Sequence, residues 1–293
     1  MARSALDGCS LALVTLLVAL LPAVARADGF DPSSQPDGTQ PIPYSARPLT
    51  LPRLVLSPRV DATLDKLRTD TAKAIFTTQN PKTLNLLIGL GASIGIIDNI
   101  EVGAVIAPIQ VLPTVAYGDP SLHGTFRFVK GSFELAGYFG TTFLTHDAVS
   151  PQVVLPVLDS NAGVVLQPGL LSRIHLGSRA KIDIGATVPI ELGNGARDLG
   201  LEVPLELAVN LAEWLHVGAT SGFGISNVKD PVINSYVPLG LIAGFAFGAE
   251  KGPVVDLGAV FRWPKFADPG QSQKFDVDDF QAGVSLAAYV YLL

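Results

Sequence analysis

The chain has 293 residues, of which 48% are hydrophobic and only 16% are charged, and its formal net charge at pH 7 is −6. Because about a quarter of the residues in a typical soluble domain are charged, this composition indicates a surface that does not face water everywhere. The acidic balance argues against a nucleic-acid partner.

The first residues have the pattern of a secretory signal peptide. Arg3 precedes an uncharged apolar run over 11–21, and an Ala-x-Ala sequence ends at Ala27. This arrangement is typical of an exported chain that is cleaved after Ala27, so we assign residues 1–27 to a signal peptide. Cys9, the only cysteine, lies within it. The exported chain is therefore expected to contain no disulfide and no thiolate metal ligand.

Residues 28–52 contain six prolines among Ser, Gln, Asp and Gly. Proline has no backbone N–H, and this composition offers little apolar side chain to bury. We predict a flexible extended tail on the periplasmic side.

From residue 53 onwards the hydrophobicity has a period of two. The clearest example runs from Leu199 to Leu211, where Leu and Val alternate with residues that include Glu202 and Glu206. A strand places these glutamates on one face, whereas a helix would scatter such an alternating series around its circumference. Segments of this kind predict twelve strands, at 53–63, 82–97, 99–112, 122–129, 132–145, 162–176, 180–192, 199–212, 215–226, 236–249, 254–265 and 279–292.

The predicted connections alternate between short and long. Tight turns are expected near 98, 130–131, 177–179, 213–214 and 250–252. Longer connections are expected at 64–81, 113–121, 146–161, 193–198, 227–235 and 266–278. Short periplasmic turns that alternate with longer extracellular loops are typical of outer-membrane barrels with an even number of strands. Residues 53–293 are therefore predicted to form an all-β fold, a closed antiparallel transmembrane β-barrel of about 12 strands with both termini periplasmic.

Two other architectures compete with this prediction. Residues 231–249 carry no charge, and Gly240, Gly244 and Gly248 would form a helix-packing face on a transmembrane helix. Pro238 and the period-two alternation favour a strand instead. A soluble sandwich would also show alternating strands, but soluble strands average five or six residues, and so continuous an apolar face would aggregate in water.

If the apolar parity faces lipid, the other parity lines the lumen. The lumen-lining candidates are Glu101, Arg127, Glu134, Arg173, His175, Lys181, Asp183, Glu191, Glu202, Glu206, His216, Asp256 and Arg262. These residues either form cross-strand ion pairs that fill a narrow barrel, or line a solvated pore that selects a charged solute. Arg127, Arg173, Lys181 and Arg262 form a basic track in the second interpretation, and pair with glutamates in the first.

Catalysis is the least favoured interpretation. His146 and Asp147 begin a long predicted loop with Ser150 nearby, which is the one starting point for a surface hydrolase. No two histidines show the short spacing of a metal site, and no cofactor is expected. We therefore predict that the protein is not an enzyme.

The chain ends in the segment 287–293, Ala-Ala-Tyr-Val-Tyr-Leu-Leu. This segment resembles the terminal strand of bacterial outer-membrane proteins, although Leu293 replaces the usual terminal aromatic residue. The resemblance implies a barrel in the outer membrane of a Gram-negative bacterium, surrounded by lipid and recognised through this strand by the barrel-assembly machinery. The expected function is a passive channel for small hydrophilic or charged solutes. The alternative is a closed structural or adhesive barrel that acts through its extracellular loops.

Overall fold

The computed structural model describes residues 41–66, 84–106, 109–112, 116–144, 163–193, 196–231, 234–248, 253–267, 277 and 279–292. The predicted signal peptide, the start of the predicted tail at 28–40, and the His146, Asp147 and Ser150 group lie outside this part of the chain.

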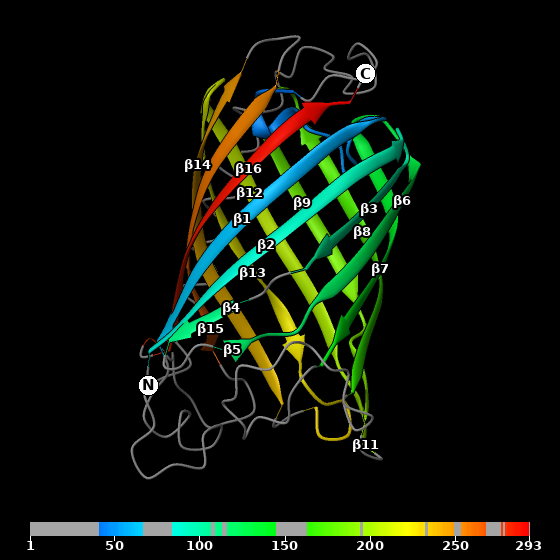
Figure 1. Cartoon of the computed structure of the whole chain (residues 1–293), viewed down its shortest axis with the longest axis vertical. Helices are drawn as coiled ribbons and strands as arrows, with labels where there is room; N and C mark the ends of the chain where they lie inside the picture. Colours follow the sequence, from blue (N-terminus) through cyan, green and yellow to red (C-terminus); the bar gives the residue numbers. More distant parts are fainter. Residues whose placement is uncertain are drawn as a thin grey trace, which may run out of the picture.

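The described residues form one closed barrel whose wall has twelve antiparallel strands (Figure 1). Four of the twelve are interrupted and consist of two consecutive segments each, namely β3 with β4, β5 with β6, β9 with β10, and β11 with β12. The strands are β1 Val55–Lys66, β2 Leu84–Ile97, β3 Ile100–Val105, β4 Ile109–Leu112, β5 Ala116–Tyr117, β6 Ser121–Val129, β7 Phe133–Phe143, β8 Val164–Leu176, β9 Ala180–Thr187, β10 Ile190–Gly193, β11 Ala196–Leu199, β12 Leu201–Ala212, β13 Leu215–Ile225, β14 Ser235–Gly248, β15 Val254–Ala267 and β16 Phe280–Tyr291.

Closure comes from β1, which pairs with β16 on one side and with β2 on the other. The predicted closed barrel of about twelve strands is confirmed. The segment 231–249, which also suited a helix, contributes strand β14. Over the described residues, no helix has the length and apolar character needed to cross a membrane.

The apolar parity lies on the outer side of the wall. In β2, Leu84, Leu90 and Ile96 remain exposed, as do Leu241 and Phe247 in β14. Small or polar residues alternate with them and face the lumen, because successive side chains of a strand point to opposite faces. A barrel that turns its apolar residues outward needs an apolar surrounding, as lipid provides.

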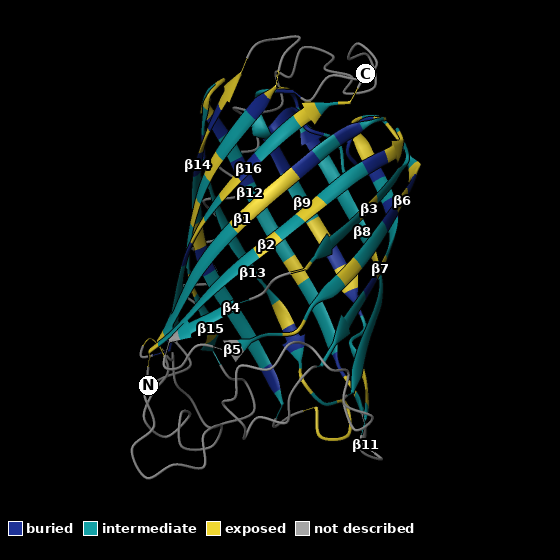
Figure 2. Cartoon of the chain, in the orientation of Figure 1, coloured by how far each residue is buried: buried dark blue, intermediate teal, exposed yellow. Residues whose placement is uncertain are grey.

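The two ends of the barrel differ. At one end, called here the short-turn end, tight turns such as Gly177–Arg179 and Glu213–Trp214 join the strands. The longer connections lie at the opposite, long-loop end. Many of the buried residues gather at the short-turn end, which is uppermost in Figure 2.

A segment that precedes the first strand explains this burial. Residues 41–54, called here the lumen segment, include the single-turn 3-10 helix η2 (Tyr44–Ala46) and lie inside the barrel. Ser45 and Thr50 are 0% and 1% exposed. The structure therefore differs from the predicted flexible tail over its part 41–52. A proline-rich stretch cannot join a sheet, but the polar side chains of the lumen can satisfy its backbone instead.

The lumen segment enters the wall at Leu54, whose φ is 58°. The Leu54 N–H donates to the Gly95 carbonyl at 2.7 Å, and the Leu292 N–H donates to the Leu54 carbonyl at 3.1 Å. A Cβ on Gly95 would lie 2.0 Å from the Pro52 carbonyl oxygen. Glycine at 95 therefore lets the segment pass close to the wall.

Candidate functional site

The lumen-lining candidates predicted from the sequence lie on the wall of the barrel. The strand registers place all thirteen candidates on the inner face: Glu101, Arg127, Glu134, Arg173, His175, Lys181, Asp183, Glu191, Glu202, Glu206, His216, Asp256 and Arg262. Glu191 lies opposite Val165 on this face and is exposed near the long-loop rim.

A row of directly opposed residues winds around the wall through successive strands. It contains Glu134, Arg173, Asp183, Glu206, Thr220, Gly240, Arg262, Gln281 and Asp65. The row begins near the short-turn end at β7 and ends near the long-loop end at β1, since barrel strands are tilted and staggered. Charges of both signs therefore follow one another along the lumen.

The short-turn half of the row is closely paired. The Arg173 guanidinium donates to both carboxylate oxygens of Asp183 at 2.6 and 2.7 Å. Lys181 Nζ lies 2.7 Å from Asp183 Oδ2 and 3.3 Å from Glu206 Oε1. Arg127 pairs with Glu134, which is 1% exposed. In this half the lumen is a network of ion pairs, and these three cations do not form a basic track.

Arg47 of the lumen segment is held by the wall from the opposite side. Its guanidinium makes two hydrogen bonds to the Asp256 carboxylate, one of them at 2.8 Å. The same group lies 5.1 Å from the ring centroid of Tyr289. A planar guanidinium matches a carboxylate with two parallel hydrogen bonds and also stacks on aromatic faces. Arg47, 4% exposed, is therefore a specific anchor of the segment.

Tyr44 is a second anchor. Its hydroxyl donates to Glu206 Oε1 at 3.0 Å, and its ring stacks on His216 with centroids 4.1 Å apart. Lys181 Nζ lies 3.8 Å from the Tyr44 ring centroid. Burial raises the pKa of Tyr44 well above its usual value, and the Glu206 charge adds to this effect. Tyr44 is therefore a neutral hydroxyl that donates to the carboxylate.

The wall also binds the backbone of the lumen segment. Carboxylates accept from it: Glu134 accepts the Leu49 N–H at 2.7 Å, and Glu101 accepts the Leu51 N–H at 2.9 Å. Arg173 Nη1 donates to the carbonyls of Arg47 and Pro48 at 2.6 and 2.9 Å. The predicted lumen charges thus act together as the receptor for a piece of the same chain.

The residues that the sequence interpretation missed are those of the lumen segment itself, above all Tyr44 and Arg47. The one signal in the sequence was an arginine and a tyrosine within an otherwise uncharged proline-rich stretch from Pro41 to Pro52. A charged side chain and an aromatic ring are the groups that a polar, ion-paired lumen binds best.

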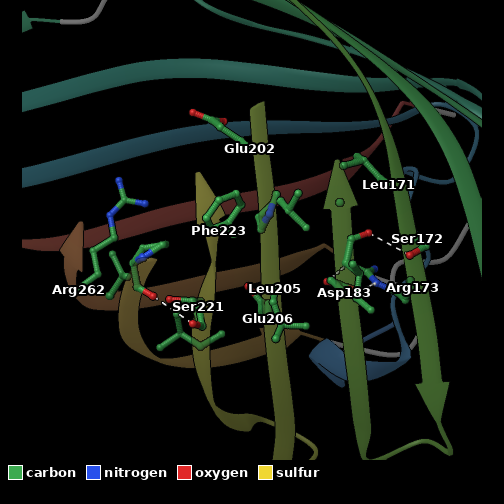
Figure 3. Close-up of a pocket in the computed structure, with 18 of the residues that line it drawn as sticks. Leu171, Ser172, Arg173, Asp183, Glu202, Leu205, Glu206, Ser221, Phe223 and Arg262 are labelled. Carbon is green, nitrogen blue, oxygen red and sulfur yellow. Dashed lines mark hydrogen bonds and ion pairs between the residues drawn. The ribbon is translucent and has the colours of Figure 1, made fainter. Parts of the chain in front are cut away.

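Beyond the lumen segment the barrel is hollow. A cavity of about 690 Å³ has Leu49 of the segment as part of its lining, together with Glu202, Glu206, Tyr236 and Arg262 of the wall (Figure 3). A second space of about 360 Å³ shares Glu206 and Arg262 with it and is also lined by Arg59, Asp61 and Gln281. The long-loop half of the lumen is therefore roomy, and its lining includes charged side chains of both signs.

Charges in this cavity are less closely paired. Glu202 accepts from Gln167 Nε2 at 3.1 Å and from the Thr187 hydroxyl at 3.5 Å. Tyr236 lines the same cavity. Arg262 is exposed and makes no ion pair with any residue that the structure describes. The guanidinium is thus available to water or to a solute.

Glycines on the inner face make room for rings that lie against the wall. A Cβ on Gly224 would lie 2.2 Å from the Tyr236 ring, and one on Gly244 would lie 2.4 Å from the His216 ring. In each pair the glycine and the ring residue lie directly opposite each other on the neighbouring strands β13 and β14. Because these rings lie over glycine, they take less of the lumen than they would over larger residues.

The described part of the chain holds no group of three or more His, Cys, Asp or Glu residues that could bind a metal ion.

No protein-family model matches this sequence, and no curated protein matches it. Among solved structures, the NanC porin aligns with 81% of this chain and 100% of its own, with a TM-score of 0.50 and 7% sequence identity. This chain has the fold of bacterial outer-membrane β-barrel proteins. An outer membrane channel from Pseudomonas putida F1 aligns with 82% of this chain and 97% of its own, with a TM-score of 0.47 and 11% identity. The outer membrane phospholipase A from Escherichia coli aligns with 83% of this chain and 93% of its own, with a TM-score of 0.39 and 9% identity. At these identities the outer-membrane β-barrel fold alone is shared.

Proposed function

We propose that this outer-membrane barrel is a passive channel for small hydrophilic solutes, charged ones included, and that its lumen segment closes the short-turn end. The observation that carries the proposal is the placement of residues 41–54 across the lumen. Their contacts reach Glu101 on β3, Glu134 on β7, Glu206 on β12 and Asp256 on β15. These strands lie on different sides of the barrel, so the segment spans its interior.

The bonds that hold the segment suit a reversible closure. Most of them are donated by the segment to side chains of the wall, and its described backbone joins the strand ladder only around Leu54. Most of these hydrogen bonds have a charged partner, and each of those contributes only about 1.5–3 kcal/mol net, because water replaces it when it breaks. The segment buries few large apolar side chains, Leu51 among them. A segment held by polar contacts can leave without exposing an apolar core.

The long-loop half supports passage of polar solutes. Its cavity is lined by charges of both signs, and the Arg59 side chain in the adjoining space is 58% exposed. A pore lined by hydrated charged groups replaces part of the hydration of a permeating solute. The alternative of a closed structural barrel would fill this space with packed, paired side chains.

Planar-bilayer recordings test the proposal. We expect the full-length protein to give discrete conductance steps, and Arg47→Ala to spend a larger fraction of time open because the segment loses its two hydrogen bonds to Asp256. The matched control is Lys229→Ala, which removes a surface cation 3.1 Å from Asp198 and should behave as the native protein. If the native protein and Arg47→Ala both fold into bilayers and remain silent, the channel proposal is wrong.

The segment can also be held in place. The Ser45 N–H donates to Asn210 Oδ1 at 2.9 Å, which brings these residues together inside the barrel. In an Arg47→Ala background, Ser45→Cys and Asn210→Cys would be joined by a short thiol-reactive crosslinker. We expect crosslinking to abolish the extra open time. Conductance that is unchanged by crosslinking would show that the path does not depend on the segment.

A further inference from the structure

We infer that the cavity on the long-loop side of the lumen segment is a binding site for small zwitterionic solutes, which carry a carboxylate at one end and an ammonium group at the other. This inference rests on the proposed channel function and names its solute class. The site is formed by Arg262 of β15, Glu202 and Glu206 of β12, and Tyr236 of β14, all of which line the cavity of about 690 Å³.

Arg262 is the carboxylate-binding end. The other lumen cations of the described chain, Arg47, Arg59, Arg127, Arg173 and Lys181, each lie within ion-pair distance of a carboxylate. Arg262 does not, and it is exposed to the cavity. An unpaired guanidinium presents two parallel N–H donors, which is the geometry that a carboxylate accepts.

The register explains why Arg262 stays unpaired. Glu206, Thr220, Gly240 and Arg262 are directly opposed in the four consecutive strands β12 to β15. The two charged residues are therefore three strand spacings apart, roughly 14 Å along the wall. Thr220 and Gly240 between them carry no charge. The gap separates the guanidinium from Glu206 and leaves space for a solute. On the other side of Arg262 the row continues to Gln281 and Asp65, and the Asp65 carboxylate accepts a hydrogen bond from Gln281 Nε2 at 2.5 Å.

Glu202 and Glu206 form the ammonium-binding end. In Figure 3 the Glu202 side chain extends from β12 and the Arg262 side chain from β15, with no contact between the two. Glu202 is held in place by hydrogen bonds from Gln167 Nε2 and the Thr187 hydroxyl. Glu206 lies two inner positions further along the same strand and already has Lys181 at 3.3 Å. Glu202 therefore carries the less compensated negative charge.

The opposed charges disfavour solutes with one charge. A simple anion is attracted by Arg262 but repelled by Glu202 and Glu206, and a simple cation experiences the reverse. A molecule with both groups gains at both ends, provided that its length suits the gap. The aromatic ring of Tyr236 and the apolar side chains of Leu49 and Leu171 in the same lining suit the methylene chain between the two groups.

Isothermal titration of the full-length protein in detergent micelles tests this inference. The probe is 6-aminohexanoate, and hexanoate and hexylamine are the one-ended controls. We expect 6-aminohexanoate to bind at least about tenfold more tightly than either control, since each charge-assisted contact is worth roughly that factor or more. Arg262→Gln and Glu202→Gln should each weaken binding about tenfold, and Lys229→Gln should leave it unchanged.

The result that overturns the inference is binding of hexanoate or hexylamine as tight as that of 6-aminohexanoate, no binding of any probe, or binding that survives Arg262→Gln. Folding of each variant is checked by its resistance to denaturation in detergent at room temperature. Because titration in micelles needs no conduction, its outcome is separate from the bilayer result. A silent barrel that binds 6-aminohexanoate contradicts the channel alone, and a conducting barrel that binds none contradicts the solute class alone.

Discussion

Arg47 and Asp256 lie 209 positions apart in the sequence and are joined inside the barrel by two hydrogen bonds between guanidinium and carboxylate. Burial opposes the positive charge of Arg47, but the hydrogen bonds that Arg47 donates to the Asp256 carboxylate, together with the charge of that carboxylate, outweigh this effect and raise the pKa of Arg47. The arginine therefore stays charged. A charged pair of this kind fixes the position of the lumen segment more than it stabilises the fold, because desolvation offsets much of the attraction.

Asp256→Asn should open the channel in the same way as Arg47→Ala, since either change removes the ion pair. The double variant should then show little more than the effect of one change, with a coupling of about 1–3 kcal/mol between the two positions. Open probability in planar bilayers measures all four members of the cycle. Additive effects would show that Arg47 and Asp256 act independently.

The control for this cycle is Asp61→Asn, because Asp61 is also a lumen carboxylate that pairs with an arginine. Its partner Arg59 lies 2.7 Å away, and both side chains are well hydrated, at 33% and 58% exposed. The pair does not touch the lumen segment among the contacts of the described chain. Asp61→Asn should leave the open probability near the native value.

Glu134→Gln should destabilise the barrel. Glu134 is 1% exposed. Its carboxylate forms an ion pair with Arg127, accepts the Leu49 N–H and lies 3.8 Å from His175 Nε2. Its neutralisation would leave the buried Arg127 charge without a counter-charge, at a cost of about 3 kcal/mol. The temperature at which the folded band converts to the unfolded one in detergent gel electrophoresis measures the change. Glu202→Gln is the control, and an equal loss in both variants would contradict the role given to burial.

The strands could be predicted from the sequence because their signal is local. Period-two alternation needs only neighbouring residues, and β12 or β2 shows it within a dozen positions. The inner face of the wall follows from the same alternation. The identity of the charges on that face, such as Glu202 and Arg262, was therefore accessible without any knowledge of the fold.

The pairing of those charges could not be predicted, because it depends on the stagger of the strands. Arg173 meets Asp183 across the tight turn between β8 and β9, but Glu134 and Glu206 join them only through registers set across the longer connections between β7 and β8 and between β9 and β12. The lumen segment was inaccessible for a similar reason. Its composition shows that it cannot form a ladder, yet the partners that order it lie more than a hundred residues away, for example Asn210 and Asp256.

Gly224→Ala should narrow the lumen. A Cβ at this position would lie 2.2 Å from the Tyr236 ring, so the ring must turn away from the wall, toward the space that Glu202 and Arg262 also line. We expect a smaller single-channel conductance in the open state, recorded in an Arg47→Ala background.

The matched control is Gly89→Ala on β2, which lies opposite the lumen residue Asp61. There the nearest heavy atom to a new Cβ would be Val105 Cγ1 at 3.8 Å, an ordinary contact. Its conductance should equal that of Arg47→Ala alone. The role assigned to the ring is refuted if Gly89→Ala and Gly224→Ala reduce conductance by the same amount.

Leu241→Arg tests which side of the wall faces lipid. Leu241 lies in the middle of β14, is 59% exposed, and stands opposite Ala219 and Phe261 on the outer face. An arginine on the lipid face near the bilayer midplane costs about 2–4 kcal/mol, whereas one in a hydrated lumen costs much less.

The control is Thr220→Arg. Thr220 follows Ala219 on the neighbouring strand β13 and faces the lumen, where the cavity can hold the new side chain. Unfolding in phosphatidylcholine vesicles with guanidinium chloride should show a large loss of stability for Leu241→Arg and a small one for Thr220→Arg. The reverse order would mean that the apolar parity faces the interior of the barrel, because an arginine is strongly destabilising only at the position that faces lipid.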